Sequence, residues 1–347
     1  MIITLVAIVK VKVRWRVREG FGFSGKRVWR FWGMGSGLHC ASTLFNALPY
    51  LYQMSTITLD EIKRLAIIAL VSDDYLMETL VLKGGNAIDL LQAGFPKKLS
   101  RSSYDLDFSM DDDFEDLEEI ATRIQRTIEN TFQEKNLVVF DYRFTAKPKQ
   151  LRDELKDFWG GYLVSFKVIT VQEYERLEGN LEKIRRGAIA VRPNQSSKVE
   201  IEISKFEYVA GKMEVLVDGF SLFIYSPIMI VLEKLRAICQ QMPAYAAIIP
   251  SHSPRPRARD FYDIQLIADQ HGIDLDSDPH RQLAAMIFGA KKVPLSFLKD
   301  ITGHAAIHRQ DFQNVVDTLP ASERAEVKSF DEYLAFVTSL AQPLTSL

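Results

Sequence analysis

The sequence is poor in cysteine and has no long apolar segment. Its two cysteines, Cys40 and Cys239, are too few among 347 residues for a disulfide framework or a cysteine-rich zinc site. The apolar run over residues 1–9 stops at Lys10, far short of the roughly 20 residues that cross a bilayer. It also lacks the positively charged start of a signal peptide. We therefore expect a cytoplasmic protein with no membrane contact.

What the sequence does contain is typical of a soluble globular chain. Hydrophobic residues make up 47% and charged residues 25%, which excludes a disordered or collagen-like protein. At roughly 150 residues per domain, the length predicts two domains. The net charge of −2 hides an asymmetry: residues 1–53 carry eight lysines and arginines against one acid, Glu19, a net +7, so the rest carries −9.

Residues 1–53 also differ from the rest in sequence pattern. They hold three of the four tryptophans and no helical repeat, although residues 9–18 alternate apolar and basic side chains as a half-buried strand does. Thr58 and Glu61 then have the spacing of a capping box that begins an amphipathic helix. One hypothesis is that the native chain begins at Met54 and that residues 1–53 are translated upstream sequence. The alternative is a basic arm that binds nucleic acid.

Several familiar motifs are incomplete. Residues 20–27 match the Gly-x4-Gly-Lys part of a phosphate-binding loop, but Arg27 stands where a serine or threonine must bind magnesium. His304 and His308 have the spacing of a zinc helix, but no catalytic glutamate lies between them. Cys239 falls on the apolar face of a predicted helix, which favours a place in the core. We reject these motifs as the source of the chemistry.

A glycine pair follows the short apolar run at residues 80–82. Lys83-Gly84-Gly85 predicts a turn, and residues 86–92 predict a helix. Two glycines let the backbone come close to a phosphate, and the N–H groups at the start of the helix offer an anion site. A plain strand-to-helix turn is the simpler interpretation of this segment taken alone.

The next segment, residues 101–110, predicts a strand with two carboxylates on one face. Residues two apart in a strand point to the same side, so Asp105 and Asp107 project together while the apolar residues beside them point into the core. Paired carboxylates repel each other unless a cation lies between them, and oxygen ligands suit Mg²⁺. The alternative is an exposed acidic strand end that continues as a solvated loop, residues 111–113, before a helix over residues 114–132.

A second predicted strand, residues 197–204, offers another carboxylate pair. Apolar residues alternate strictly with Glu200 and Glu202, which share the opposite face. Solvent-facing glutamates explain this pattern adequately. If this strand lies beside that of Asp105, however, one glutamate can complete a cluster of three carboxylates, and we favour Glu202.

These segments together resemble the AbiEii/AbiGii family of nucleotidyltransferase toxins, which have the polymerase-β-type nucleotidyltransferase fold. The matching segments are Leu82-Lys83-Gly84-Gly85-Asn86-Ala87-Ile88, Arg101-x-Ser103-x-Asp105-Leu106-Asp107-Phe108-Ser109, Glu233-Lys234-Leu235-Arg236-Ala237 and Arg259-Asp260-Phe261-Tyr262-Asp263-Ile264. The resemblance covers about residues 58–270 and departs at Asn86, where the family usually has threonine or serine.

The resemblance implies an α/β (α+β) fold with a polymerase-β-like nucleotidyltransferase core and a helical C-terminal domain. We expect the core at residues 54–210 and the helical domain at residues 220–345, after the atypical basic extension of residues 1–53. It also implies that Asp105, Asp107 and Glu202 hold two Mg²⁺ ions. The nucleotide would be bound by Gly84, Gly85, Asn86, Arg101, Ser103 and Lys234, with Lys83, Asp263, Arg259 and Glu200 as further candidates.

Lys234 can also be interpreted physically. It follows a helix start at Ser226-Pro227 and has apolar neighbours three and four residues away on both sides, so its stem lies on or beside the apolar face. Such a lysine either extends its ammonium out to solvent or has an anionic partner. Asp260 and Asp263 share one helical face, and one of them could hold Lys234 or Arg259 in place or accept the proton of an attacking hydroxyl. A helix cap at Asp260 is the simpler alternative.

The reaction implied by the resemblance is transfer of a nucleoside monophosphate from an NTP to an acceptor hydroxyl, with release of pyrophosphate. The implied acceptor is RNA, with the 3′ end of tRNA as the best candidate, and the implied role is a toxin neutralised by a separately encoded antitoxin. Two alternatives stay open: a nucleotidyltransferase that modifies a protein or a small molecule, and a non-catalytic module on a decayed fold. The acidic body of the chain argues mildly against extensive RNA contact.

Overall fold

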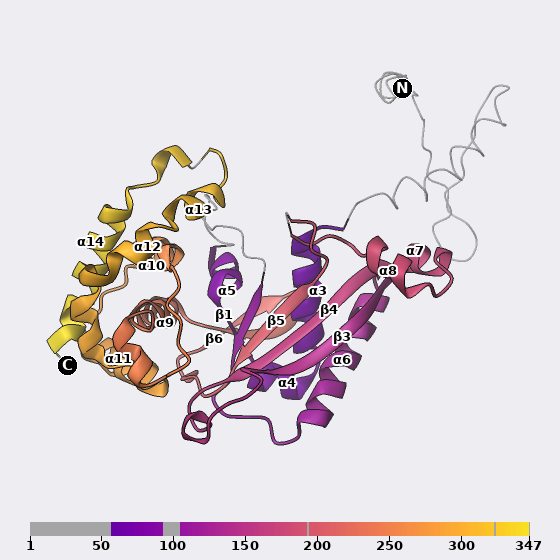
Figure 1. Ribbon diagram of the computed structural model, residues 1–347, viewed down its shortest axis with the longest axis horizontal. Helices are drawn as coiled ribbons and strands as arrows, with labels where there is room; N and C mark the ends of the chain where they lie inside the picture. The colour runs from indigo at the N-terminus through magenta and orange to yellow at the C-terminus, as the bar shows by residue number, and fades with distance from the viewer. Residues whose placement is uncertain (1–56, 93–104, 193, 323, 347) are drawn as a thin grey trace, which may run out of the picture. The chain divides into compact units, whose positions relative to one another are not determined.

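A mixed seven-stranded sheet organises the first part of the described chain (Figure 1). The computed structural model describes residues 57–92, 105–192, 194–322 and 324–346. The hypotheses about residues 1–53 therefore lie outside the described residues, as do Arg101 and Ser103. The combination of this sheet with many helices confirms the predicted α/β class.

The sheet order is β3-β4-β5-β2-β1-β7-β6. Strand β2 runs parallel to β5 and β1 runs parallel to β7, while the other neighbours are antiparallel. The strands are β1 (Val81–Lys83), β2 (Leu106–Ser109), β3 (Leu137–Lys147), β4 (Gly161–Thr170), β5 (Val199–Ser204), β6 (Met213–Val217) and β7 (Phe220–Ile224). The two strands predicted to carry carboxylates are thus direct neighbours.

Helices α3 (Leu59–Val71), α4 (Asp74–Thr79) and α6 (Leu117–Gln133) lie together behind the sheet in Figure 1. The predicted capping box is confirmed, because Thr58 Oγ1 accepts the Glu61 N–H while the Glu61 carboxylate accepts the Thr58 N–H. Helix α6 was expected to begin at residue 114. It begins later because Asp116 caps it by accepting the N–H groups of Glu118 and Glu119.

The three aspartates before α6 do not behave alike. Asp111 and Asp112 are exposed, as a solvated loop predicts. Asp113 instead pairs with Lys205 and accepts a hydrogen bond from the Tyr162 hydroxyl. The solvated-loop prediction is therefore wrong for Asp113, which ties this loop to β4 and to the segment after β5.

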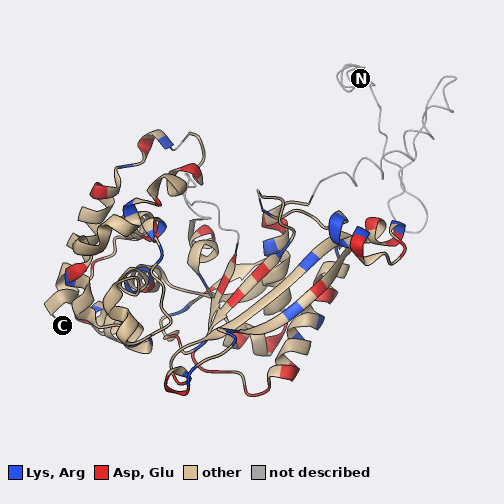
Figure 2. Cartoon of the chain, viewed as in Figure 1, with Lys and Arg blue, Asp and Glu red and all other residues tan. Residues whose placement is uncertain are grey.

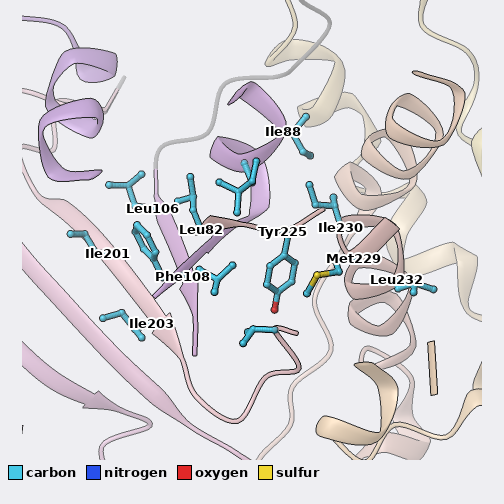
Figure 3. Packing of buried hydrophobic residues seen from close by; sticks show 14 of the residues in the cluster. Leu82, Ile88, Leu106, Phe108, Ile201, Ile203, Tyr225, Met229, Ile230 and Leu232 are labelled. Carbon is cyan, nitrogen blue, oxygen red and sulfur yellow. The ribbon is translucent and has the colours of Figure 1, made fainter. Parts of the chain in front are cut away.

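The alternation in β2 and β5 sets one face of each strand into the core. Leu106, Phe108 and Ile201 are fully buried, and Ile203 nearly so, and Figure 3 shows them packed together with Leu82 of β1. Complete burial of such side chains contributes about 1.5–3 kcal/mol each. The same alternation turns the carboxylates of both strands to the opposite face. Figure 2 shows acidic residues, in red, on strands of the sheet.

Among the described residues, further short helices follow strands of the sheet or lie in the last part of the chain. They are α5 (Gly84–Leu91), α7 (Val171–Arg176), α8 (Leu181–Gly187), α12 (Ala305–Arg309) and α13 (Phe312–Asp317). Helix α5 was expected to begin at residue 86, but it begins directly at the glycine pair. The glycines are therefore the first turn of the helix, where backbone N–H groups have no partner within the helix.

The C-terminal part is helical, as the resemblance predicts. Its longer helices are α9 (Pro227–Cys239), α10 (Ala258–His271), α11 (Asp278–Ala290) and α14 (Phe330–Ala341). The predicted start of α9 is confirmed, with Ser226 as N-cap and Pro227 in the first turn. Cys239 is fully buried, as expected for a core residue. Among the described residues, no helix is long and apolar enough to cross a membrane.

Candidate active site

A cleft of about 880 Å³ brings the sheet and the C-terminal helices together at one site. Its walls carry charged side chains from β1, β2 and β5 on one side, and from α9 and the start of α10 on the other. The residues that line the cleft include most of those singled out from the sequence: Lys83, Gly84, Gly85, Asp105, Asp107, Glu202, Lys234, Arg259 and Asp260.

The register of the central strands forms a carboxylate array on one face of the sheet. Asp107 lies directly opposite Glu202 of β5 on one side and opposite Lys83 of β1 on the other. Asp105 and Glu200 precede this pair by two residues on their strands and so face the same way. The two acidic strands lie side by side, which was the condition for a cluster of three carboxylates.

Burial and mutual repulsion disfavour the charged form of these aspartates. Burial is the main cause that raises the pKa of Asp107 to about 6; Lys83 opposes the shift, while Glu202 and Asp105 add to it. Burial also raises the pKa of Asp105, against the lowering effect of Arg192. Carboxylates with raised pKa values that converge in a cleft are typical of a functional site.

Basic side chains that the sequence did not single out neutralise this array. Arg192 Nη2 bonds both Asp105 Oδ1 and Glu200 Oε2, the latter at 2.7 Å. Lys198 Nζ lies 2.6 Å from Glu200 Oε1, and Lys147 pairs with Glu202. No local pattern marks the contacts of Arg192 with Asp105 or of Lys147 with Glu202, because these partners are 87 and 55 residues apart in the sequence.

The donor set suits a hard divalent cation, but it is not assembled as a three-ligand site. Asp105 and Asp107 supply carboxylate oxygens on one strand face, which is the kind of donor that Mg²⁺ takes. Within the described ranges, no three acidic, histidine or cysteine side chains converge closely enough to hold a metal ion. The Glu202 carboxylate is ion-paired with Lys147 instead of converging with Asp105 and Asp107.

Gly84 makes the closest backbone approach to the array. Its φ is +67°, in the left-handed region that favours glycine, and a Cβ at this position would lie 2.8 Å from Asp107 Oδ2. The glycine pair was predicted to admit a phosphate. Its observed consequence is that α5 can begin directly beside Asp107.

The side chain of Asn86 has a structural contact. Its Nδ2 donates a hydrogen bond of 2.6 Å to the backbone carbonyl of Asp105, and the side chain is buried. This bond fixes the start of β2 relative to α5. Asparagine provides the N–H donor that this contact needs, whereas a threonine or serine hydroxyl is shorter.

Lys83 joins the array to a second, buried cluster. Its Nζ donates to Ser204 Oγ at 3.1 Å and lies 3.6 Å from Glu207 Oε1. Glu207 also pairs with Arg236 at 2.7 Å and with Lys291 at 3.7 Å. Burial alone would raise the pKa of Glu207, but these three cations lower it to about 2.

The sequence analysis missed this cluster almost entirely. Arg236 could have been suspected, since it is a further charge, after Glu233 and Lys234, in the largely apolar helix α9. Glu207 and Lys291 give no local signal. Burial lowers the pKa of Lys291 to about 8, against the opposing effect of Glu207.

Lys234 is a buried ion-paired lysine. Only 4% of the residue is exposed, which rules out an ammonium extended to solvent. Its Nζ donates to Asp260 Oδ1 at 2.9 Å and to Asp263 Oδ2 at 2.8 Å. The prediction that these aspartates share a helical face and can hold Lys234 is confirmed geometrically.

Asp260 is not a helix cap, because the N-cap of α10 is Arg257. Its second oxygen, Oδ2, lies 2.5 Å from Arg257 Nε. Burial alone would raise the pKa of Asp260, but Arg257 and Lys234 hold it far below the usual range. Arg259 is exposed in the cleft, and His308 Nδ1 accepts the Arg257 N–H at 3.0 Å.

Comparison with known proteins identifies the family of this chain. Residues 68–336 match the family described as "Nucleotidyl transferase AbiEii toxin, Type IV TA system". Among solved structures, an antigenic nucleotidyltransferase-like protein from Paracoccidioides brasiliensis is 15% identical at a TM-score of 0.34, over 68% of this chain and 94% of that chain. No curated protein matches the sequence. Because the family match covers most of the chain, this protein belongs to the AbiEii family of nucleotidyltransferase toxins of type IV toxin–antitoxin systems.

Proposed function

We propose that the chain transfers a nucleoside monophosphate from an NTP to an acceptor hydroxyl, with divalent metal held by Asp105, Asp107 and Glu202. Membership of the family implies a nucleotide substrate and an antitoxin partner. The observation that carries the proposal is the register of Asp107 between Lys83 and Glu202, in the wall of the cleft that also contains Lys234.

The ion-pair partners of Glu200 and Glu202 indicate which of the two glutamates can join the proposed metal site. Glu200 is held by both Arg192 and Lys198, whereas Glu202 has one partly exposed lysine partner. Glu202 is therefore the easier of the two glutamates to release toward Asp105 and Asp107. A divalent cation bound there, and a second one beside it, would polarise the phosphates and lower the pKa of the acceptor hydroxyl.

The triphosphate would lie along the basic side of the cleft. The first turn of α5, at Gly84 and Gly85, offers unpaired backbone N–H groups to an anion. Lys234 adds a fixed ammonium, and Arg259 adds an exposed guanidinium. By the family pattern, Arg101 and Ser103 would contribute to the same binding.

Asp260 and Asp263 of α10 position the ammonium of Lys234. A carboxylate whose pKa is far below the usual range is a weak base, so Asp260 is poorly suited to accept the proton of the acceptor hydroxyl. Its bonds to Lys234 and Arg257 instead support a positioning role, shared with Asp263.

RNA remains our proposed acceptor, with the 3′ end of tRNA as the first candidate. Arg255, Arg257 and Arg259 line the cleft together with Lys147, which gives the acidic chain a local basic surface. Phosphate contacts need such clustered basic residues. A protein or a small molecule as acceptor is the second candidate, because the same cleft could serve either.

The test is to incubate the protein with each labelled NTP and with total RNA or total protein. We expect label in RNA, dependence on divalent metal, and no label with Asp105→Asn. Label in the protein fraction alone would exclude RNA as the acceptor. Undiminished transfer in excess chelator would exclude the metal.

A further inference from the structure

Every carboxylate of the array has a basic side chain of the same chain beside it. Arg192 bridges Asp105 and Glu200, Lys198 pairs with Glu200, and Lys147 pairs with Glu202. Lys83 of β1 lies opposite Asp107 of the neighbouring strand β2. Three of the four carboxylates are thus ion-paired, and Lys83 lies opposite the fourth while its ammonium contacts Ser204 and Glu207.

Of these basic side chains, Arg192 makes the strongest contact with a proposed metal ligand, Asp105. One guanidinium nitrogen contacts two carboxylates, and the exposed fractions of the Arg192 and Asp105 side chains are 25% and 42%. The Lys147–Glu202 pair is more open, with 52% and 40% of its side chains exposed. Ion pairs that are screened by solvent contribute little free energy. The Arg192–Asp105 contact is therefore stronger than the Lys147–Glu202 contact.

The backbone of Arg192 is fixed independently of the carboxylates. Its N–H donates to the Ser196 carbonyl at 3.2 Å, and its own carbonyl accepts the Gln195 N–H at 3.0 Å. A turn therefore anchors Arg192 beside the start of β5. The guanidinium can leave Asp105 by side-chain rotation and still reach Glu200, which it already contacts.

A divalent cation and the guanidinium would meet at the same oxygen of Asp105 and repel each other. We propose that Arg192 competes with the divalent cation for Asp105, so that metal binding requires Arg192 to leave Asp105 and remain on Glu200. The inference rests on the proposed metal role of Asp105. Its consequence is a protein that binds free metal weakly until Arg192 moves.

Mn²⁺ binding to the full chain without nucleotide tests this directly, because it does not depend on activity. We expect Arg192→Gln to bind Mn²⁺ roughly three- to tenfold more tightly than the unchanged protein, as for removal of a partly exposed charge contact. Lys198→Gln is the matched control, because Lys198 pairs only with Glu200. It should change the affinity by less than about twofold, a small effect typical of an exposed pair.

Asp105→Asn separates this inference from the proposed function. If Asp105→Asn weakens Mn²⁺ binding and Arg192→Gln leaves it unchanged or weaker, Arg192 positions Asp105 and the competition is overturned. If Asp105→Asn leaves Mn²⁺ binding unchanged, the metal role of Asp105 fails and the inference fails with it. Should Arg192→Gln fold poorly, Arg192→Lys keeps the charge but reaches one carboxylate, and intermediate tightening is expected.

Discussion

The backbone of Gly84 lies so close to Asp107 that a side chain at position 84 would touch the carboxylate, with a Cβ-to-Oδ2 distance of 2.8 Å. The turn that begins α5 and the strand that bears Asp107 therefore constrain each other. This contact links the glycine pair of the family pattern to the aspartates that follow it.

Gly84→Ala should reduce nucleotide transfer much more than a comparable substitution elsewhere. Alanine would be strained at φ +67° and would displace the Asp107 carboxylate. Gly272→Ala is a matched control, because Gly272 has φ +61° and nothing within 4 Å of the added atom. Both should lose about 1 kcal/mol of stability from backbone strain, measured by denaturant unfolding. Equal activities of the two variants would contradict the proposed importance of this contact.

Asp105→Asn and Asp107→Asn should each abolish transfer without unfolding the protein. Each removes a charge that a metal needs and changes little volume. Because burial raises the pKa of Asp107 to about 6, the neutral amide also removes an unfavourable buried charge, and the melting temperature should stay the same or rise. Asp111→Asn, at an exposed position, is the control. Wild-type turnover in either active-site variant would remove that residue from the mechanism.

Lys234→Ala should both unfold more easily and transfer less nucleotide. The sequence alone suggests a tolerated change, because alanine is a better helix former than lysine. The observed pairing reverses this expectation, since two buried aspartates would lose their shared cation. Removal of one partner from a buried ion pair costs about 3–5 kcal/mol.

Lys234→Met combined with Asp263→Asn separates the two effects on Lys234. Asp260 keeps Arg257 as its cation in this variant, so much of the lost stability should return. Transfer should stay low if the ammonium binds phosphate. Recovery of both stability and transfer would show that Lys234 serves the fold alone.

His308 should contribute a loss of stability between about pH 6.5 and pH 4, opposed by Asp107, whose pKa, raised to about 6, favours the folded protein as the pH falls. Burial lowers the pKa of His308 from 6.5 to about 4, so the unfolded chain binds a proton in this window that the folded protein excludes. The contribution of His308 to the free energy of unfolding should therefore decrease by on the order of 3 kcal/mol as the pH falls through the window. His308→Asn should flatten this dependence, whereas His280→Asn should not. An unchanged slope in His308→Asn would refute the assignment.

Local patterns were sufficient to predict part of the site. The capping box at Thr58, the start of α9 at Pro227 and the shared face of Asp260 and Asp263 all depend on residues a few positions apart. The boundaries of α5 and α6 were less accurate, because side-chain caps and the glycine turn decide where a helix begins.

The alternation of apolar residues and carboxylates in β2 and β5 can be predicted from the amino-acid order, because side-chain direction in a strand has a period of two. The position of Asp107 between Lys83 and Glu202, and the contact of Arg192 with Asp105 across 87 residues, depend instead on the assembled fold. Contacts of this kind depend on strand order and register. Residues so far apart leave no periodic signal, so their pairing appears only when the sheet is assembled.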